Sequence, residues 1–411
     1  MNRVETVEKA LRRIWSFSKA LDLALIDEEV KKGLKLEVGY RHGERVGYMA
    51  VRLGYILGLR GKDLILLLVA ALMHDIGAVG GFADYHGKTE LIEYHSVLGA
   101  EIFEKVFPHN GYLAEVLRNH HKTPADGQDI SLEAKIISLA DKVDIIMGRN
   151  LLSEEERARI CREIHLAEGT VYYPEVTGAF LQLAEEEAFW LYMKEDEFLE
   201  PTALMLVSGS NGQFYSDYLY VAELMYSDEI TDKLAETFAF LIDQKSSYTG
   251  KHSRMVAENA CLLAEGLGWD AEKCREIKLA GLLHDLGKLA VPKKILDKAE
   301  PLREEEFQIV KTHTFHTYNL LSLARFSKNI VEWASYHHER LDGTGYPFRM
   351  SADTLTTGAR LMAIADIFTA LTEDRPYRRA LPRERAMNIL EKNAGAWVDQ
   401  ELLEVARRKL L

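Results

Sequence analysis

The run at residues 337–347 reads HHERLDGTGYP and joins a pair of metal-binding side chains to a tight loop. His337 and His338 are adjacent imidazoles, which are common ligands of transition metals. Glu339 follows them, and we expect its carboxylate to orient one of the imidazoles from behind. Two glycines let the backbone turn tightly and approach a ligand, and the final proline fixes the exit of the turn. This combination predicts one wall of a metallohydrolase pocket.

Further histidines and aspartates stand in apolar segments on both sides of this run. Asp285 closes the apolar stretch LAGLLHD, and Asp366 lies inside the apolar stretch LMAIADIFTAL. A buried carboxylate is unfavourable unless it is paired or bound to a cation, whereas a single histidine on a helix is usually an ordinary polar residue. The ordered set therefore predicts a metal centre with these ligands: His252, His284, Asp285, His313, His337, His338 and Asp366.

Five imidazoles and two carboxylates are enough ligands for two divalent ions. Two ions about 3.5–4 Å apart can clamp a phosphodiester and lower the pKa of a bound water. Asp285 is the natural bridge, because a carboxylate offers two oxygens. We assign His252, His284, Asp285 and Asp366 to one ion, and His313, His337, His338 and the second oxygen of Asp285 to the other. Nitrogen and oxygen ligands without thiolates suit Fe, Mn, Co, Ni or Zn.

The order of these residues resembles the HD-GYP family, a branch of the HD metal-dependent phosphohydrolases. Residues 337–347 match its signature HHExxxGxGYP at every fixed position, and the resemblance covers about 231–411. It implies two Fe or Mn ions and hydrolysis of a bacterial cyclic dinucleotide, chiefly cyclic di-GMP to pGpG or GMP. It implies catalytic roles for Asp285 and Lys288. The substrate-binding candidates are Lys288, Arg340, Gly345, Tyr346, Pro347, Arg375 and Arg378.

Other functions stay open at this point. The substrate 3′,3′-cyclic GMP-AMP is a rival, because a plain HD domain in tandem with an HD-GYP domain resembles some enzymes that act on it. A non-catalytic cyclic-dinucleotide receptor is disfavoured by the complete ligand set with Lys288. An oxidative di-iron HD protein is disfavoured by the Gly-Tyr-Pro loop. Tyr248 stands where some family members carry a glutamate for a third metal, so we expect a dinuclear site.

The first half of the chain repeats the same skeleton. The matched residues are His42, His74, Asp75, His95, His120, His121 and Asp141, which precede their C-terminal counterparts by 210 to 225 positions. A repeat of this length indicates a duplicated domain. Ala78 replaces the lysine, and no Gly-Tyr-Pro loop follows His121. We interpret the copy as a degenerate HD domain that is regulatory, scaffolding or dimerising, and both a second metal site and relic histidines stay open.

Hydrophobic periodicity is helical over almost the whole chain, which predicts an all-α protein of two tandem HD-type bundles. We place the N-terminal HD domain at 1–198, the connection at 199–228 and the catalytic HD-GYP domain at 229–411. Residues 202–207 are the candidate for a short β segment in the connection. Four tyrosines gather further along it, at 215, 218, 220 and 226, and we expect them to pack the domains together.

Composition agrees with an enzyme that acts on a small molecule. The net charge of −13 disfavours binding to a DNA or RNA duplex. The longest apolar run, residues 64–73, is too short to span a membrane, and the three cysteines have no metal-ligand spacing. We therefore expect a cytoplasmic protein whose partner is a cyclic dinucleotide, without a membrane partner. A homodimer is the expected assembly, although no residue pattern specifies it.

Overall fold

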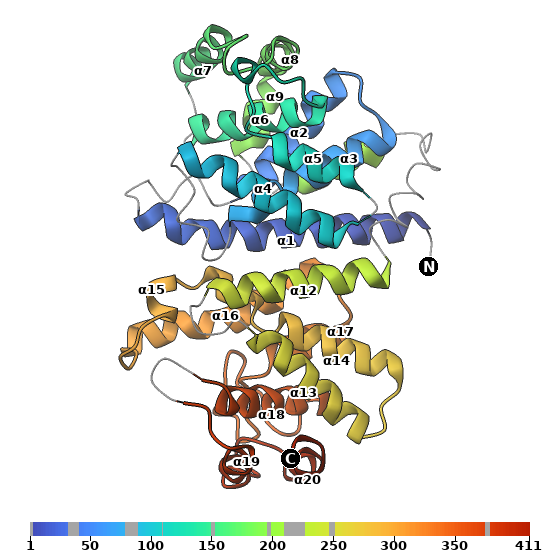
Figure 1. Ribbon diagram of the computed structural model, residues 1–411, viewed down its shortest axis with the longest axis vertical. Helices are drawn as coiled ribbons and strands as arrows, with labels where there is room; N and C mark the ends of the chain where they lie inside the picture. The colour runs from blue at the N-terminus through green and yellow to red at the C-terminus, as the bar shows by residue number, and fades with distance from the viewer. Residues whose placement is uncertain are drawn as a thin grey trace. The chain divides into compact units, whose positions relative to one another are not determined.

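The computed structural model describes residues 3–31, 41–78, 89–108, 110–148, 153–194, 199–208, 227–245, 251–374 and 379–411. Within these ranges the secondary structure is helical, and the only β features are isolated bridges, so the predicted all-α fold is confirmed (Figure 1). The chain divides into two compact units, Met1–Thr231 and Asp232–Leu411. The finer domain boundaries and the role given to each domain stay predictions.

The first unit is built from helices that surround the apolar helix α3 (Gly61–Leu72). Its elements are α1 (Arg3–Lys31), α2 (His42–Ile56), α3 (Gly61–Leu72), η1 (Ile76–Ala78), α4 (Thr89–Val106), α5 (Gly111–Asn119), η3 (Pro124–Asp126), α6 (Leu132–Met147), α7 (Glu154–Leu166), α8 (Pro174–Ala184), α9 (Glu187–Lys194) and α10 (Leu199–Ser208). Helix α3 is apolar over most of its length and is buried from Leu64 onward, while α2 packs against both α3 and α6. Burial of this apolar surface is the main stabilising contribution to the unit.

The second unit repeats this plan. Its elements are α12 (Asp228–Lys245), which leads into it, followed by α13 (His252–Gly266), α14 (Ala271–Leu283), η5 (Leu286–Ala290), α15 (Lys293–Leu296), α16 (Glu304–Leu323), α17 (Lys328–Ser335), α18 (Thr357–Thr372), α19 (Arg383–Glu391) and α20 (Gln400–Leu410). Helix α13 packs against α14 and α18. The order α2, α3, η1, α4, α5, α6 thus returns as α13, α14, η5, α16, α17, α18, which confirms the internal duplication.

The predicted β segment at 202–207 is wrong, because these residues belong to helix α10. Leu199, Ala203, Leu204 and Val207 are its buried residues, and their spacing of three to four positions is that of one helical face. The run of apolar residues alone could not distinguish the two structures. The four tyrosines assigned to packing lie at 209–226, outside the described residues.

A glycine explains how each unit brings its His-Asp pair to the next ligand helix. In the second unit, a Cβ on Gly287 would overlap the carbonyl oxygen of His313 and lie 2.8 Å from the backbone nitrogen of Thr317. In the first unit, a Cβ on Gly77 would overlap the carbonyl oxygen of His95. The turn after His-Asp therefore packs backbone against backbone in both copies, and only glycine leaves room for this approach.

Candidate metal centre

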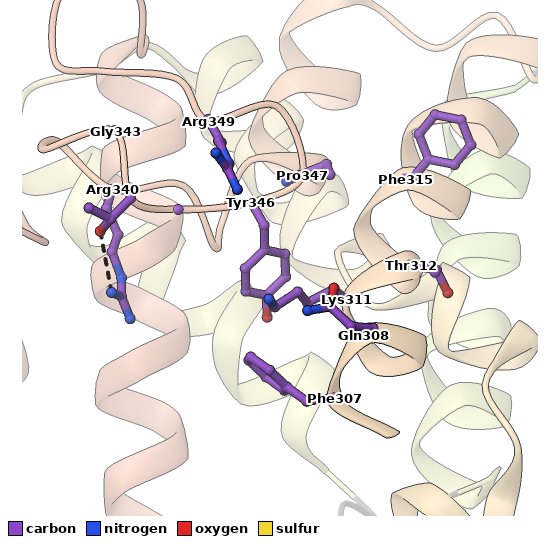
Figure 2. Close-up of a pocket in the computed structure, with 12 residues that line it drawn as sticks. Phe307, Gln308, Lys311, Thr312, Phe315, Arg340, Gly343, Tyr346, Pro347 and Arg349 are labelled. Atoms are coloured by element: carbon purple, nitrogen blue, oxygen red, sulfur yellow. Dashed lines mark hydrogen bonds between the residues drawn. The ribbon is translucent and has the colours of Figure 1, made fainter. Parts of the chain in front are cut away.

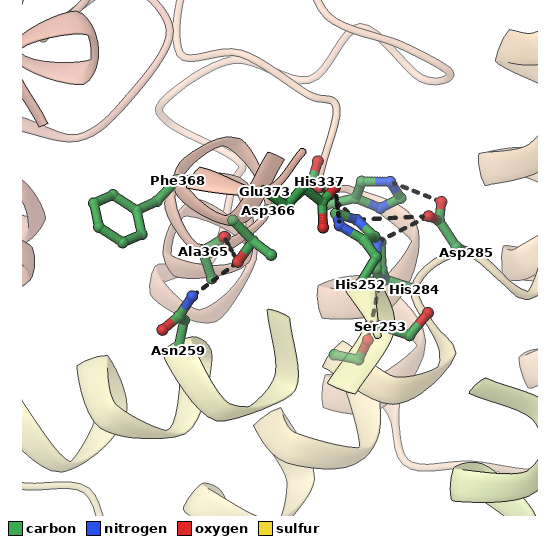
Figure 3. Close-up of polar contacts among 12 residues, drawn as sticks. His252, Ser253, Asn259, His284, Asp285, His337, Ala365, Asp366, Phe368 and Glu373 are labelled. Carbon is green, nitrogen blue, oxygen red and sulfur yellow. Dashed lines mark hydrogen bonds and ion pairs between the residues drawn. The ribbon is translucent and has the colours of Figure 1, made fainter. Parts of the chain in front are cut away.

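The seven predicted ligands of the second unit converge on one largely buried cluster, and Figure 3 shows His252, His284, Asp285, His337 and Asp366 among them. They come from the start of α13 (His252), the end of α14 (His284 and Asp285), the middle of α16 (His313), the segment after α17 (His337 and His338) and the buried side of α18 (Asp366). Three groups of these side chains place their ligand atoms within 4.8 Å of one another. The groups are His252, His284 and Asp366; His284, Asp285 and His337; and His313, His337 and His338.

Backbone carbonyls fix the orientation of three of these imidazoles. Nδ1 of His284 donates to the carbonyl of Gly281 at 2.7 Å, and Nδ1 of His313 donates to that of Val310 at 2.6 Å. Nδ1 of His337 donates in the same way to the residue three positions before it, at 2.7 Å. A carbonyl can only accept, so each Nδ1 carries the proton and each Nε2 presents a lone pair.

These lone pairs face the two carboxylate oxygens of Asp285. Nε2 of His284 lies 3.1 Å from Oδ2, and Nε2 of His313 lies 3.4 Å from Oδ1. Among the described residues, His284 Nε2 and Asp285 Oδ1 have no hydrogen-bond partner. Electron pairs that face one another without a proton between them are stabilised by a cation, so the donor set fits divalent metal ions.

The protonation states of His313, His338 and Asp285 suit the same purpose. Burial lowers the pKa of His313 to about 3 and that of His338 to about 4, so both rings are neutral at physiological pH. Burial alone would raise the pKa of Asp285, but the neighbouring His284 and Lys288 outweigh it and hold that pKa well below its usual range. Neutral imidazoles and an ionised carboxylate are the forms that bind metals.

Two carboxylates that the sequence did not single out hold His252 in place. Nδ1 of His252 lies 2.9 Å from Oε1 of Glu373, which turns Nε2 toward Asp366 at 3.2 Å. Asp243, at the end of α12, accepts the hydroxyl of Ser253 at 2.8 Å and its backbone N–H at 3.3 Å, which caps the start of α13. Asp22 caps α2 in the same way through the N–H of Gly43 at 3.0 Å. Both aspartates reach these helix starts from another helix, so no local sequence pattern indicated their role.

Asp243 gives a pH-dependent prediction. Burial raises its pKa to about 6 from an ordinary 3.8, so the folded chain holds a proton that the unfolded chain has lost between these values. Stability should therefore fall as pH rises from about 4 to 6, by an amount on the order of 3 kcal/mol. We expect Asp243→Asn to remove this slope in urea unfolding of the metal-free protein. Asp353→Asn, at an exposed aspartate, is the control; an unchanged slope in Asp243→Asn would contradict the assignment.

The seven N-terminal residues also converge. His42 Nε2 lies 3.3 Å from Asp141 Oδ1 and 3.6 Å from Asp75 Oδ2, while His95 Nε2 lies 3.5 Å from the other oxygen of Asp75. Two groups, His42 with His74 and Asp75, and His95 with His120 and His121, have the compactness of metal ligands. The first unit therefore keeps a donor set that fits metal ions.

The outer support of the N-terminal cluster differs from that of the C-terminal one. Asp144, three residues after Asp141 on α6, lies 2.7 Å from Nδ1 of His42 and accepts two hydrogen bonds from Arg45 at 2.5 and 2.9 Å. In the second unit the corresponding contact comes from Glu373, at the end of α18. Ala78 is buried where the second unit has Lys288, so the described part of the first unit has no lysine at this position.

Glu339 has another role than the predicted one. Its carboxylate accepts the backbone N–H groups of Phe348 at 2.7 Å and Met350 at 3.0 Å, so it fastens the far end of the Gly-Tyr-Pro loop rather than an imidazole. Gly345 is buried against the backbone of Glu339 and Arg340, where a Cβ would come within 2.5 Å of two atoms. Gly345 therefore allows a close approach between two parts of the loop backbone, whereas the sequence had suggested an approach to a ligand.

We expect Glu339→Gln to loosen this loop. The amide offers one acceptor oxygen without charge, so one buried N–H loses its partner and the other loses a charge-assisted bond, at about 1–3 kcal/mol. Hydrogen exchange at Phe348 and Met350 should accelerate by a corresponding factor. Glu332→Gln, which removes only a pair with the exposed Lys328, should leave these amides unchanged. Equal exchange in both variants would show that Glu339 does not hold the loop.

Four predicted substrate residues line one cavity of about 740 Å³ beside the cluster: Arg340, Gly345, Tyr346 and Pro347 (Figure 2). Nζ of Lys288 pairs with Asp285, and the side chains of Lys288 and His338 are 24% and 29% exposed, whereas those of the six remaining ligands are at most 10% exposed. The cluster therefore opens on the side of Lys288 and His338. Arg375 and Arg378, and also Tyr248, lie outside the described residues.

Known proteins agree with the fold and with the class of enzyme. Residues 39–146 and 236–402 each match a family model described as an HD domain. The 3′3′-cGAMP-specific phosphodiesterase 1 of Vibrio cholerae is 31% identical over 386 residues, which cover 89% of this chain and 86% of that protein. The cyclic di-GMP phosphodiesterase response regulator RpfG of Xanthomonas campestris is 34% identical over 186 residues, 44% of this chain and 49% of that protein.

A solved structure shares the fold along the whole chain. The crystal structure of the V. cholerae cyclic GMP-AMP phosphodiesterase V-cGAP3 superposes with a TM-score of 0.65 over 97% of both chains, at 22% identity. The chain belongs to the HD-GYP family of HD-domain phosphodiesterases. None of the described helices combines the length and the apolar character that a membrane span requires.

Proposed function

We propose that the second unit hydrolyses a 3′–5′ phosphodiester bond of a guanine-containing cyclic dinucleotide. The observation that carries this proposal is the Asp285-centred cluster, where imidazole lone pairs and carboxylate oxygens face one another beside an open rim. Two ions held by His252, His284, Asp285 and Asp366, and by His313, His337, His338 and Asp285, would supply an activated water and neutralise charge on the phosphoryl oxygens. Fe and Mn are the ions that we propose.

The protein's own residues support the other parts of this reaction. Lys288 lies at the rim and next to Asp285, where its ammonium can neutralise a phosphoryl oxygen or donate a proton to the leaving 3′ oxygen. Arg340 offers a guanidinium at the mouth of the cavity, stacked 4.2 Å from the ring centroid of Trp397. Such a planar cation suits the second phosphate of the ring or a guanine edge.

Two substrates deserve direct comparison. The V. cholerae relative that is named specific for 3′3′-cGAMP matches both units of this chain. Relatives named for cyclic di-GMP match less than half of it. We therefore propose 3′,3′-cyclic GMP-AMP as the first candidate and keep cyclic di-GMP, the leading prediction from sequence, as the second. The products would be a linear dinucleotide and, after a second cleavage, mononucleotides.

The test is the ratio of kcat/KM for the two substrates, measured anaerobically with Fe(II) and separately with Mn(II) and with chromatographic separation of products. A ratio well above one for cyclic GMP-AMP supports the first candidate, and a ratio well below one supports cyclic di-GMP. Binding without cleavage of either would overturn the proposal in favour of a receptor. In a separate assay of the Fe(II) protein with O₂ supplied, consumption of O₂ without phosphodiester cleavage would favour an oxidative di-iron protein.

We propose a regulatory role for the first unit. Its cluster keeps the seven donor residues but has Ala78 in place of the lysine and no Gly-Tyr-Pro loop after His121. A metal bound there would stabilise the folded unit. The unit would still lack the lysine and the Gly-Tyr-Pro loop that the second unit offers to a substrate.

A further inference from the structure

Helix α16 carries an exposed aromatic stripe on the side opposite to its buried face. Phe307, Lys311 and Phe315 follow one another at intervals of four residues, so they share one side of the helix. Phe307 is 37% exposed and Phe315 is 49% exposed, whereas His313 and Thr317 on the other side are buried. Exposed aromatic side chains grouped around a cation are typical of a ligand-binding surface.

The stripe faces the Gly-Tyr-Pro loop across the cavity of about 740 Å³, a volume typical of a small-molecule site (Figure 2). The rings of Phe307 and Tyr346 meet edge to face, with 6.2 Å between their centroids. Nζ of Lys311 lies 4.5 Å from the centroid of Phe307 and 5.8 Å from that of Tyr346. The cavity thus combines flat aromatic walls with a cation that both rings stabilise.

Tyr346 joins this cavity to the metal ligands. Its ring centroid lies 4.9 Å from that of His338 and 6.5 Å from that of His313. A phosphodiester at the rim of the cluster would therefore have its attached nucleoside close to Tyr346 and Phe307. Lys311, Arg340 and Arg349 surround the same cavity with positive charge, which complements an anionic ligand in a chain of net charge −13.

We propose that this cavity binds one nucleobase of the dinucleotide, stacked on the ring of Phe307 with Tyr346 at its edge, and with Lys311 neutralising the adjacent phosphate. The proposal rests on the proposed function and extends it to residues of α16 that no sequence motif indicated. Stacking on aromatic side chains tolerates any base, so Phe307 would contribute affinity, while the choice between guanine and adenine would depend on polar groups around it.

The experiment compares Phe307→Leu and Lys311→Gln with wild type, using 3′,3′-cyclic GMP-AMP and cyclic di-GMP. Leucine keeps an apolar side chain but removes the flat ring, so we expect KM to rise about tenfold for both substrates with kcat changed less than twofold. Lys311→Gln should raise KM and weaken the dependence of KM on salt. Ile309→Ala, on the same turn but outside the cavity, and Lys328→Gln, at an exposed lysine, are the controls.

The outcomes separate this inference from the function on which it rests. If wild type cleaves a dinucleotide and both cavity variants keep its KM, the nucleobase site is wrong and the proposed function stands. If wild type cleaves neither substrate, the proposed function fails. The cavity is then judged by equilibrium binding of cyclic di-GMP: weaker binding in Phe307→Leu than in Ile309→Ala supports it, and equal binding overturns it.

Discussion

Replacing Asp285 by alanine is expected to abolish hydrolysis of the cyclic dinucleotide while the chain stays folded. Asp285 faces His284, His313 and Lys288 together, so its loss removes the bridge between both proposed ions. Loss of a residue that only hydrogen-bonds to a metal ligand lowers metal affinity or activity about 10–100-fold, and loss of a ligand should cost more. We therefore expect a fall on the order of 10³-fold or more in kcat/KM, with a lower metal content per chain.

The matched variant is Asp75→Ala, because Asp75 takes the same place in the first unit. We expect it to leave cleavage of the dinucleotide within a few-fold of wild type, since the proposed reaction takes place in the second unit. Circular dichroism and metal analysis of both variants separate unfolding from loss of ligands. Equal loss of activity in Asp75→Ala and Asp285→Ala would mean that the first unit is catalytic or is required for catalysis.

Gly287→Ala is expected to produce the second large effect, although it touches no metal ligand side chain. The new Cβ would overlap the carbonyl oxygen of His313 and approach the nitrogen of Thr317, and neither backbone atom can move without shifting α16. Overpacking of this kind lowers stability by about 1–3 kcal/mol or more. The shift would also separate His313 from Asp285, so metal content and activity should fall together with the urea midpoint.

The control is Gly178→Ala, inside α8, where an added Cβ meets no atom within 4 Å. Alanine is favoured over glycine in a helix by about 0.5–1 kcal/mol, so this variant should be as stable as wild type or more so. Gly77→Ala should repeat the Gly287 effect in the first unit. A Gly287→Ala protein with the stability and metal content of wild type would contradict the backbone contact between η5 and α16.

Prediction from the sequence was most successful for the polar residues that face inward. His252, His284, Asp285 and Asp366 are polar residues inside apolar helical patterns, and burial of such residues is unfavourable without a partner. That contrast, repeated in both halves of the chain, pointed to two clusters, and the structure brings both sets together. The helical periodicity that placed them also predicted the all-α fold.

Features that depend on contacts across the fold could not be predicted in this way. Glu339 stands next to two histidines in sequence, yet its carboxylate reaches forward to Phe348 and Met350, because the loop folds back over it. Glu373 and Asp243 contact His252 and Ser253 from other helices, and no local pattern links them. Residues 202–207 have an apolar run that suits a strand as well as a helix, and only their packing decides for the helix.

The exposure of the aromatic stripe of α16 could not be predicted from local sequence either. Phe307 and Phe315 have the spacing of an ordinary buried helical face, and no sequence pattern indicated that they are exposed. Their exposure follows from the orientation of the helix. His313 points into the cluster, and Thr317 accepts a hydrogen bond from the backbone N–H of Gly287. The position of a metal ligand thus decides which side of the helix a substrate can reach.

The most direct test of the two-metal centre is anomalous diffraction from crystals of protein reconstituted anaerobically with Fe(II) or Mn(II), recorded on both sides of the absorption edge. The account predicts two peaks in the second unit, one beside His252, His284 and Asp366 and one beside His313, His337 and His338, with Asp285 between them. A single peak in that unit, or peaks in the first unit alone, would contradict it.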